Sequence, residues 1–484
     1  MNEKSNKLVI LTGYFKEESY GLLGPQMAAT IINAHTNYNA IVVGVTNEDD
    51  PRDLKSALNN YFGDQQKILG FSSLGGRPDL FDLAAVLKQE GAVTILAGPQ
   101  AGADYKGEVD WQSYPHRFKG VSDCFSFALH GPAQQIIPIL SAGFDKDISK
   151  FDGVLCRDIN GRISETPSIA WDDNYLSDVD WQTLYGLKNK AFKPLKITIA
   201  QVLQQIGCQH AALQRKICVD YPWILQKQGI LQKNGILQKQ GLKPPFVTLD
   251  QKGCSFCDVA KDKGYLGGVS DKALKQQLNC LPEDIKGRKI AFELINESPL
   301  PKLSKVFKLA EESGIQLSQI NLTLRADYLI KGLKHLTKAL EIATKKNVRI
   351  LLSSIGFESF DDTILKNLNK GIDKQTNLDA IKAIRKLKSR YPAHLGYLKE
   401  EGANHGFIHP TPWDNKQISH EINKTISVYQ LSLDILPNHS TPLIIHHASG
   451  LADWIREIEV RENIEFQRVG TTIGWWQTKD QSLL

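Results

Sequence analysis

Short apolar runs alternate with amphipathic segments along most of this chain, and that alternation restricts the fold more than any other feature. In the first 145 residues the apolar runs cover 8–11, 40–44, 67–72 and 93–97. Segments with helical patterning lie between them, most clearly at 26–37 and 79–90. Strands that alternate with helices predict a parallel, doubly wound α/β sheet, in which ligands bind at the carboxyl ends of the strands.

The same alternation returns after residue 245, with longer helices. Further strands are expected at 245–250, 289–295, 320–324, 348–353 and 406–409. Helices are expected at 300–313, 328–346 and 375–388. This half of the chain therefore predicts a partial or complete βα barrel, with its chemistry on the loops that follow the strands.

A chain of 484 residues is expected to form two or three domains. We predict a first domain at 1–145, a linker at 146–244, a barrel at 245–430 and a small extension at 431–484. Within the linker, residues 224–241 repeat a six-residue unit, Ile-Leu-Gln-Lys-Gln/Asn-Gly, three times. This period fits neither a helix nor a strand, so we interpret it as a surface-loop insertion, whose closure costs little entropy.

The composition is that of a soluble globular protein, with 42% hydrophobic and 23% charged residues. The net charge of +5 is close to balanced, so no nucleic-acid partner is expected. The seven cysteines are odd in number and scattered, unlike a disulfide framework. No run reaches the roughly 18 apolar residues of a membrane span. We expect a cytoplasmic protein without a membrane partner.

Two cysteines, Cys254 and Cys257, follow the strand predicted at 245–250. Thiols at this spacing can bind one metal centre from a single tight loop, as zinc and iron–sulfur sites require. A zinc site needs a second Cys or His pair, and none follows at a suitable spacing. A redox-active pair would normally begin a helix, but residues 258–268 are charged and rich in glycine.

The run Cys254-Ser-Phe-Cys257 resembles the second half of the Cys-x-x-x-Cys-x-Phe-Cys loop of radical S-adenosylmethionine (SAM) enzymes. In that family three thiolates bind a four-iron, four-sulfur cluster, and SAM chelates the remaining iron. Where the family has its first cysteine, this chain has Asp250. The third ligand is therefore open between Cys218, the harder oxygen ligand Asp250, and none.

The barrel half also resembles this family. Ile355-Gly-Phe-Glu-Ser-Phe360 and Leu368-Asn-Lys-Gly371 are similar to its Gly-x-Glu-Ser and Leu-x-Lys-Gly segments, and Leu324-Arg-Ala-Asp327 is similar to its strand-end Arg-x-Asp. The resemblance implies that the following residues bind SAM: Glu297, Arg325, Glu358 and Ser359. Taken singly, Glu358 could instead be a solvated loop acid, and Arg325 could pair with Asp327 at the rim.

The first domain resembles the cobalamin-binding, Rossmann-like domain that precedes many radical SAM barrels. In that family a Ser-x-Leu turn and a Gly-Gly turn line the pocket for the nucleotide tail. The matching residues here are Ser72, Ser73, Gly75, Gly76, Gly98 and Pro99. The Asp-x-His-x-x-Gly signature is absent, as it commonly is in cobalamin-dependent radical SAM enzymes. The alternative is a domain that binds nothing.

Taken together, these resemblances imply a radical SAM enzyme that uses a 4Fe-4S cluster to cleave SAM. The expected reaction is a cobalamin-dependent methylation or a related radical modification of a small-molecule or peptide substrate. A flavodoxin or ferredoxin would supply electrons. Two alternatives stay open. One is another radical SAM reaction, such as methylthio transfer or rearrangement, with a structural first domain. The other is a non-catalytic binding protein, because Asp250 replaces the first cysteine.

Overall fold

The computed structural model describes residues 6–72, 76–223, 225, 246–257, 264–435 and 440–479. The chain divides into two compact units, one comprising Met1–Val202 and Val269–Ile290 and the other comprising Leu203–Gly268 and Ala291–Leu484. The boundaries predicted at 145, 244 and 430 stay predictions, and nearly all of the six-residue repeat lies outside the described residues. In the described part of the chain, no helix is long and apolar enough to cross a membrane.

The first unit contains a nine-stranded sheet. Its strands are β1 (Asn6–Gly13), β2 (Tyr38–Val45), β3 (Ile68–Phe71), β4 (Val93–Leu96), β5 (Phe127–Leu129), β6 (Val154–Arg157), β7 (Ile163–Glu165), β8 (Leu184–Lys188) and β9 (Ala191–Pro194). The order is β7-β6-β5-β4-β3-β1-β2-β8-β9, and β1 to β5 run parallel. The predicted parallel α/β sheet is confirmed here, and β6, β7 and β9 add antiparallel edges.

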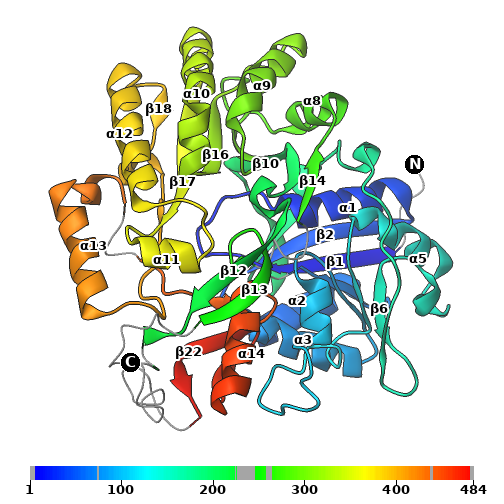
Figure 1. The fold of residues 1–484 in the computed structure, drawn as a ribbon. Helices are drawn as coiled ribbons and strands as arrows, with labels where there is room; N and C mark the ends of the chain where they lie inside the picture. Colours follow the sequence, from blue (N-terminus) through cyan, green and yellow to red (C-terminus); the bar gives the residue numbers. More distant parts are fainter. Residues whose placement is uncertain are drawn as a thin grey trace. The chain divides into compact units, whose positions relative to one another are not determined.

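Helices cover both faces of this sheet, as Figure 1 shows. They are α1 (Leu23–His35), α2 (Pro51–Phe62), α3 (Pro78–Gln89), α4 (Ala101–Lys106) and α5 (Ile136–Ala142). Helix α8 (Asp271–Cys280) also belongs to this unit. Apolar residues of α2 and α3 form one core with the central strands, and α1 lies on the opposite face. Sequence patterning did not predict α2, although Asp50 caps it and Pro51 begins it, which is a usual start for a helix.

The second unit has a parallel sheet of its own. The strands are β15 (Ala291–Ile295), β16 (Gln319–Arg325), β17 (Arg349–Glu358), β18 (Leu395–Gly396) and β19 (Gly406–Phe407). β15 pairs with β16 and β16 with β17, while β18 and β19 pair with opposite ends of β17. These strands confirm the parallel character predicted for this half. Strand β10 (Ile199–Leu203) contains the point, after Val202, at which the chain passes from the first unit to the second.

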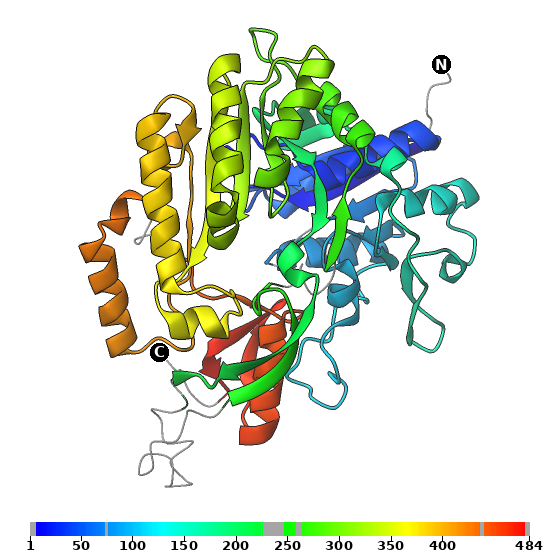
Figure 2. The same ribbon diagram turned by 45° about the horizontal axis from the view of Figure 1, so that its top comes forward.

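Long helices follow the strands of the second unit. They are α9 (Leu300–Glu312), α10 (Ala326–Lys346), α11 (Asp362–Asn367), α12 (Lys374–Arg390), α13 (Lys416–Val428) and α14 (Gly450–Glu462). Figures 1 and 2 show α9, α10 and α12 side by side, alongside β16 and β17. Helix α10 begins directly after β16 at Ala326, so the last residue of that strand is also the residue that precedes the helix.

Smaller sheets complete the second unit. One pairs β11 (Gln205–Gly207) with β14 (Tyr265–Gly268), and another pairs β12 (Gln214–Asp220) with β13 (Phe246–Lys252). The third contains β20 (Ile445–His446), β21 (Phe466–Val469) and β22 (Thr472–Thr478).

The expectation that the strand at 245–250 begins the barrel is wrong. That strand is β13, which pairs antiparallel with β12 rather than parallel with β15. The reason lies in its pattern, because every second residue of β13 is exposed, as in a strand with one solvated face. β16, in contrast, is largely buried on both faces.

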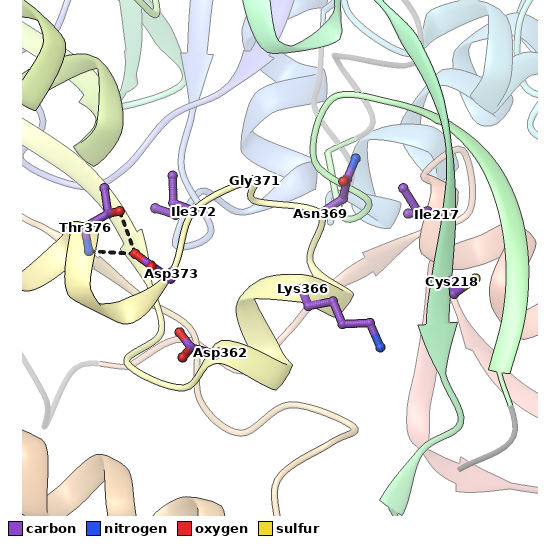
Figure 3. A pocket seen from close by; sticks show the side chains of 9 residues that line it. All are labelled: Ile217, Cys218, Asp362, Lys366, Asn369, Gly371, Ile372, Asp373 and Thr376. Carbon is purple, nitrogen blue, oxygen red and sulfur yellow. Dashed lines mark hydrogen bonds between the residues drawn. The ribbon is translucent and has the colours of Figure 1, made fainter. Parts of the chain in front are cut away.

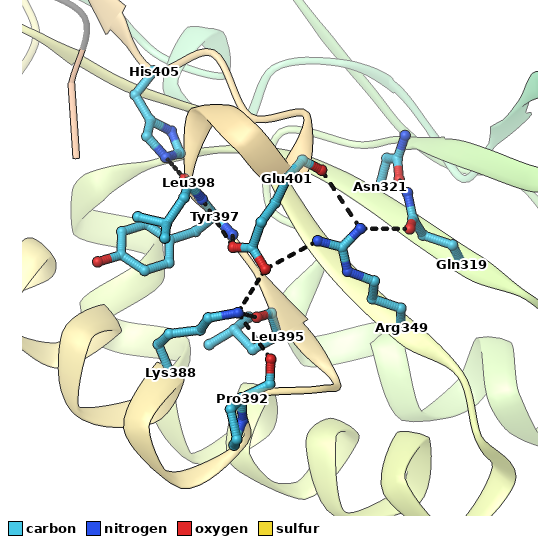
Figure 4. A network of polar contacts seen from close by, with 10 residues as sticks. All are labelled: Gln319, Asn321, Arg349, Lys388, Pro392, Leu395, Tyr397, Leu398, Glu401 and His405. Carbon is cyan, nitrogen blue, oxygen red and sulfur yellow. Dashed lines mark hydrogen bonds and ion pairs between the residues drawn. The ribbon is translucent and has the colours of Figure 1, made fainter. Parts of the chain in front are cut away.

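A partly buried polar network fixes the amino ends of β16 and β17 (Figure 4). The Glu401 carboxylate accepts from Lys388 Nζ at 2.6 Å, and it lies 3.1 Å from Arg349 Nη2. Its other oxygen accepts from the backbone N–H groups of Tyr397 and Leu398. Arg349 begins β17 and also donates to Gln319, which begins β16. Glu401 therefore ties the loop after β18 to both strands.

We expect Glu401→Gln to destabilise the protein in a pH-dependent way. Burial raises the pKa of Glu401, but Lys388 and the two backbone donors outweigh burial and lower it to about 2. The stabilisation by the ionised carboxylate is thus complete above its ordinary pKa near 4.5 and disappears as the pH falls through about 2. Glu401→Gln should lower the free energy of unfolding at pH 7 by about 2 kcal/mol, a typical value for charged hydrogen bonds.

Urea unfolding between pH 7 and pH 2 measures this difference. The matched control is Glu400→Gln, which changes the exposed neighbour and should have little effect at any pH. A deficit in Glu401→Gln that stays constant down to pH 2 would show that the charge of Glu401 is not the cause.

Candidate functional site

Charged side chains gather at the carboxyl ends of β15, β16 and β17 in the second unit. Arg325 is the last residue of β16 and Glu358 the last residue of β17, while Glu297 follows β15 by two residues. In the sheet, Arg325 lies opposite Gly356 of β17. Carboxyl ends of neighbouring parallel strands meet at one edge, so three of the predicted SAM-binding residues lie along one sheet edge. Their role in binding SAM stays a prediction.

A buried ion pair lies at the centre of this edge. Lys370 Nζ is 2.8 Å from Glu358 Oε1, and Lys370 is only 4% exposed. Burial opposes the charge of Lys370, but Glu358 and Cys254 outweigh it, so the pKa of the ammonium lies above its ordinary value. Glu358 is therefore not a solvated loop acid.

The backbone next to this ion pair has an unusual conformation at Glu358 and a glycine at position 356. Glu358 has a positive φ of 62°, which is unusual for a residue with a side chain. A Cβ on Gly356 would lie 2.6 Å from Glu358 Oε1 and 2.7 Å from Lys370 Nζ, so only glycine leaves room for the pair at that position.

Arg325 connects the ion pair to the cysteine loop. It is 4% exposed, its Nη2 donates to the carbonyl oxygen of Lys370, and its Nη1 lies 3.5 Å from Cys254 Sγ. Its Nε also donates to Asp327 at 3.0 Å. The predicted alternative of a pair between Arg325 and Asp327 is present, but it is buried rather than at a rim.

The cysteine loop is held against the segment that follows α11. The buried Ser255 donates its N–H to Leu368 O at 3.0 Å and its hydroxyl to Asn367 O at 2.8 Å. Asn369 donates to Gly253 O at 2.7 Å. The structure thus brings together the Cys254 loop and the Leu368-Asn-Lys-Gly371 segment, which lie far apart in the sequence.

Glu297 and Ser359 differ in accessibility. Glu297 is open to solvent, yet enough protein surrounds its carboxyl that desolvation raises its pKa. Lys370 and Arg325 act in the opposite direction. An accessible carboxylate beside this site could accept a hydrogen bond from a cationic ligand. Ser359 is fully buried, and its Oγ accepts from Asp361 N at 3.2 Å.

The two residues considered as a third cluster ligand both lie on the β12–β13 pair. Cys218 is opposite Thr248, with its Sγ 3.8 Å from Thr248 Oγ1, and Asp250 is opposite Lys216. Cys218 and Asp250 are exposed. Figure 3 shows Cys218 lining a pocket of about 590 Å³ together with residues of α11 and the loop after it. A role of either residue in metal binding stays a prediction.

Sequence reasoning missed Cys208, which lies close to the site. It follows β11, and its thiol interacts electrostatically with Glu297, Cys254 and Arg325. Burial, followed by Glu297, raises the pKa of this thiol. The signal in the sequence was its position shortly after the apolar run of β10. Cys218 was preferred instead because it is the nearest cysteine upstream of Cys254.

In the first unit, the described residues among those predicted to bind cobalamin follow the carboxyl ends of β3 and β4. Ser72 donates its N–H to Leu11 O at 2.9 Å, and Thr12 Oγ1 donates to Ser72 O. Gly98 has φ +97°, and a Cβ there would lie 2.8 Å from Ser72 Oγ. Gly76 and Pro99 belong to the described residues and are close to Ser72 and Gly98 in the sequence. Ser73 and Gly75 lie outside the described residues.

These residues fit the edge of a ligand site. The order β2-β1-β3-β4-β5 reverses direction between β1 and β3, and ligands of such sheets bind at that point. Ser72 follows β3 directly. Because Gly98 has no side chain, its backbone stays accessible next to the Ser72 hydroxyl. Cobalamin binding at this edge stays a prediction.

Solved structures of OxsB, described as a cobalamin-dependent S-adenosylmethionine radical enzyme, share this fold. The structure with aqua-cobalamin and S-adenosylmethionine bound has a TM-score of 0.57 and 11% identity. The one with aqua-cobalamin alone has 0.55 and 11%, and the apo structure 0.55 and 10%. Each match covers 97% of this chain but only 64% of OxsB. No family model and no curated protein matches the sequence.

We expect Lys370→Met to destabilise the second unit strongly, because it leaves the Glu358 carboxylate buried without its partner. Removal of one member of a buried ion pair costs roughly 3–5 kcal/mol. Urea unfolding of Lys370→Met should therefore show a loss near the lower limit, since Glu358 keeps some exposure. The control is Lys374→Met, which removes an exposed lysine nearby. Equal stability of the two variants would contradict a buried pair.

Proposed function

We propose that this chain is a radical SAM enzyme of the cobalamin-dependent type. The observation that carries the proposal is the contact of the Cys254 loop with Arg325, and through it with the Lys370–Glu358 pair, at the carboxyl ends of β16 and β17. The fold shared with OxsB supports it. A barrel arrangement of the second unit, with the site at its open end, belongs to the same proposal.

The donor set fits an iron–sulfur cluster with SAM beside it. Cys254 and Cys257 provide thiolates from one loop. Arg325 and Lys370 place two cations next to that loop, which offset the negative charge of thiolates. Glu297 and Glu358 provide carboxylates suited to the ammonium group and the ribose hydroxyls of SAM. Ser359 would support the same site from its buried position.

When bound, the cluster and SAM supply the radical chemistry and cobalamin supplies a methyl group. The chain's own residues bind and orient these groups. Cys254 and Cys257 would hold iron, while Arg325 keeps the loop against β16 and Lys370 fixes the Glu358 carboxylate. The edge at Ser72 and Gly98 would accept cobalamin. The substrate is then a small molecule or peptide, and a flavodoxin or ferredoxin would deliver electrons.

Anaerobic reconstitution with ferrous iron and sulfide tests the cluster. We expect the wild-type chain to take up four irons with visible thiolate-to-iron absorbance. Its reduced form should give an electron paramagnetic resonance signal that changes on addition of SAM. Cys254→Ala/Cys257→Ala should lose both the iron and the absorbance, whereas the control Cys124→Ala/Cys156→Ala, in the first unit, should keep them. Four irons in the first double variant would refute the proposed site.

Retention of hydroxocobalamin tests the first unit separately. After incubation and desalting, the wild-type chain should keep corrin absorbance without imidazole ligation, since the His signature is absent. Gly98→Ala should weaken retention, because the new methyl group would displace Ser72 Oγ. The control Gly91→Ala has a similar φ of +90° but meets nothing within 4 Å. No retention by the wild-type chain would favour a structural first unit and a different radical SAM reaction.

A further inference from the structure

Resting on the proposed function above, we propose that Cys208 is the third thiolate of the cluster site. The cysteine motif of this chain would then be split in the sequence. Cys208 precedes strand β12, whereas Cys254 and Cys257 follow strand β13.

The first connection joins Cys208 to the chain just beyond the cysteine loop. Cys208 N donates to Gly264 O at 2.8 Å, and the preceding Gly207 pairs with Tyr265. Gly207 has φ +79°, and a Cβ on it would lie 2.3 Å from Gly264 O. Only glycine allows this approach of two backbones. Cys208 is thus fixed beside Gly264 and Tyr265, which follow Cys257 in the sequence.

The second connection runs through Asn369. Its carbonyl oxygen lies 2.8 Å from His210 Nε2, and its amide donates to Gly253 O at 2.7 Å. One residue therefore bonds both to the segment that follows Cys208 and to the residue that precedes Cys254. Asn369 thus holds the segment after Cys208 beside the cysteine loop, and the β11–β14 pairing holds Cys208 beside Gly264.

The third connection is electrostatic. The Cys208 thiol lies near enough to Cys254 and Arg325 for their charges to affect it, and Arg325 Nη1 lies 3.5 Å from Cys254 Sγ. The two sulfurs consequently share the neighbourhood of one buried guanidinium. Gln204, four residues before Cys208, donates its N–H to Ile295 O at 3.1 Å, which places this segment at the carboxyl end of β15.

The spacing of the thiols does not match a site for a single zinc ion. In the described part of the chain, the sulfurs of Cys208, Cys254 and Cys257 are not gathered within 4.8 Å of one another. Thiolates around one zinc ion lie roughly 4 Å apart, because zinc–sulfur bonds measure about 2.3 Å. A cluster of several irons accepts a wider separation.

Cys218 and Asp250 are placed less well. Cys218 lies opposite Thr248, and the four residue-to-residue steps from Thr248 to Lys252 span roughly 14 Å at about 3.4 Å each, still short of Cys254. Asp250 lies on the exposed face of β13, whereas Gln251, on the other face, donates to Cys254 O at 3.0 Å. Binding at Cys208 requires only that its thiol release a proton to solvent as the sulfur bonds to iron.

Cys208→Ala and its matched control Cys218→Ala test the inference by iron counting and visible absorbance after anaerobic reconstitution with ferrous iron and sulfide. Cys208→Ala should lose most of the bound iron, and Cys218→Ala should keep the wild-type content. Circular dichroism checks that both variants are folded. Wild-type iron in Cys208→Ala would overturn the inference.

Thiol protection in the wild-type chain gives a second measurement that needs no variant. Iodoacetamide labelling, read by mass spectrometry, should fall on reconstitution at Cys208, Cys254 and Cys257 and stay unchanged at Cys218. Labelling of Cys208 that does not fall would overturn the inference. If the wild-type chain binds no iron at all, the proposed function fails. If it binds a cluster that Cys218→Ala loses and Cys208→Ala keeps, only the inference fails.

Discussion

The Lys370–Glu358 ion pair is the interaction on which the arrangement of the second unit depends. Two charges taken out of water are costly unless each meets its partner closely, so the pair fixes the end of β17 relative to the loop after α11. Arg325 then binds the carbonyl of Lys370, and the loop containing Cys254 binds the three residues that precede Lys370. A change at Lys370 would consequently disturb the cysteine loop without touching it.

Local patterns in the sequence were sufficient for the parallel strands and for the position of Arg325 and Glu358, because uninterrupted apolar runs indicate buried strands and their last residues lie at one sheet edge. They were not sufficient for β13, whose alternating exposure differs from the other strands but whose partner, β12, is set by pairing across a long insertion. They also could not show that Lys370 is the partner of Glu358. Burial of a lysine depends on contacts between segments that no local window contains.

Local sequence patterns also could not identify Cys208 as a residue of the proposed site. A motif search expects ligands at fixed spacing, whereas the chain needs only that the ligands be close in space. Backbone pairing of β11 with β14 and the bonds of Asn369 provide that closeness. In the first unit the reverse holds, since Ser72 follows β3 directly and Gly98 comes two residues after the neighbouring β4, so a local pattern was enough to place them at one edge.

The antiparallel register of β12 and β13 has a consequence for how the gene can change. Asp220 and Phe246 are paired neighbours, and the three six-residue units lie between them in the sequence. Because doubling the length of a loop costs only about 0.6 kcal/mol, gain or loss of whole units leaves both strand ends in place at little cost. Slippage during replication of this tandem repeat, in multiples of complete codons, would therefore meet weak selection from folding.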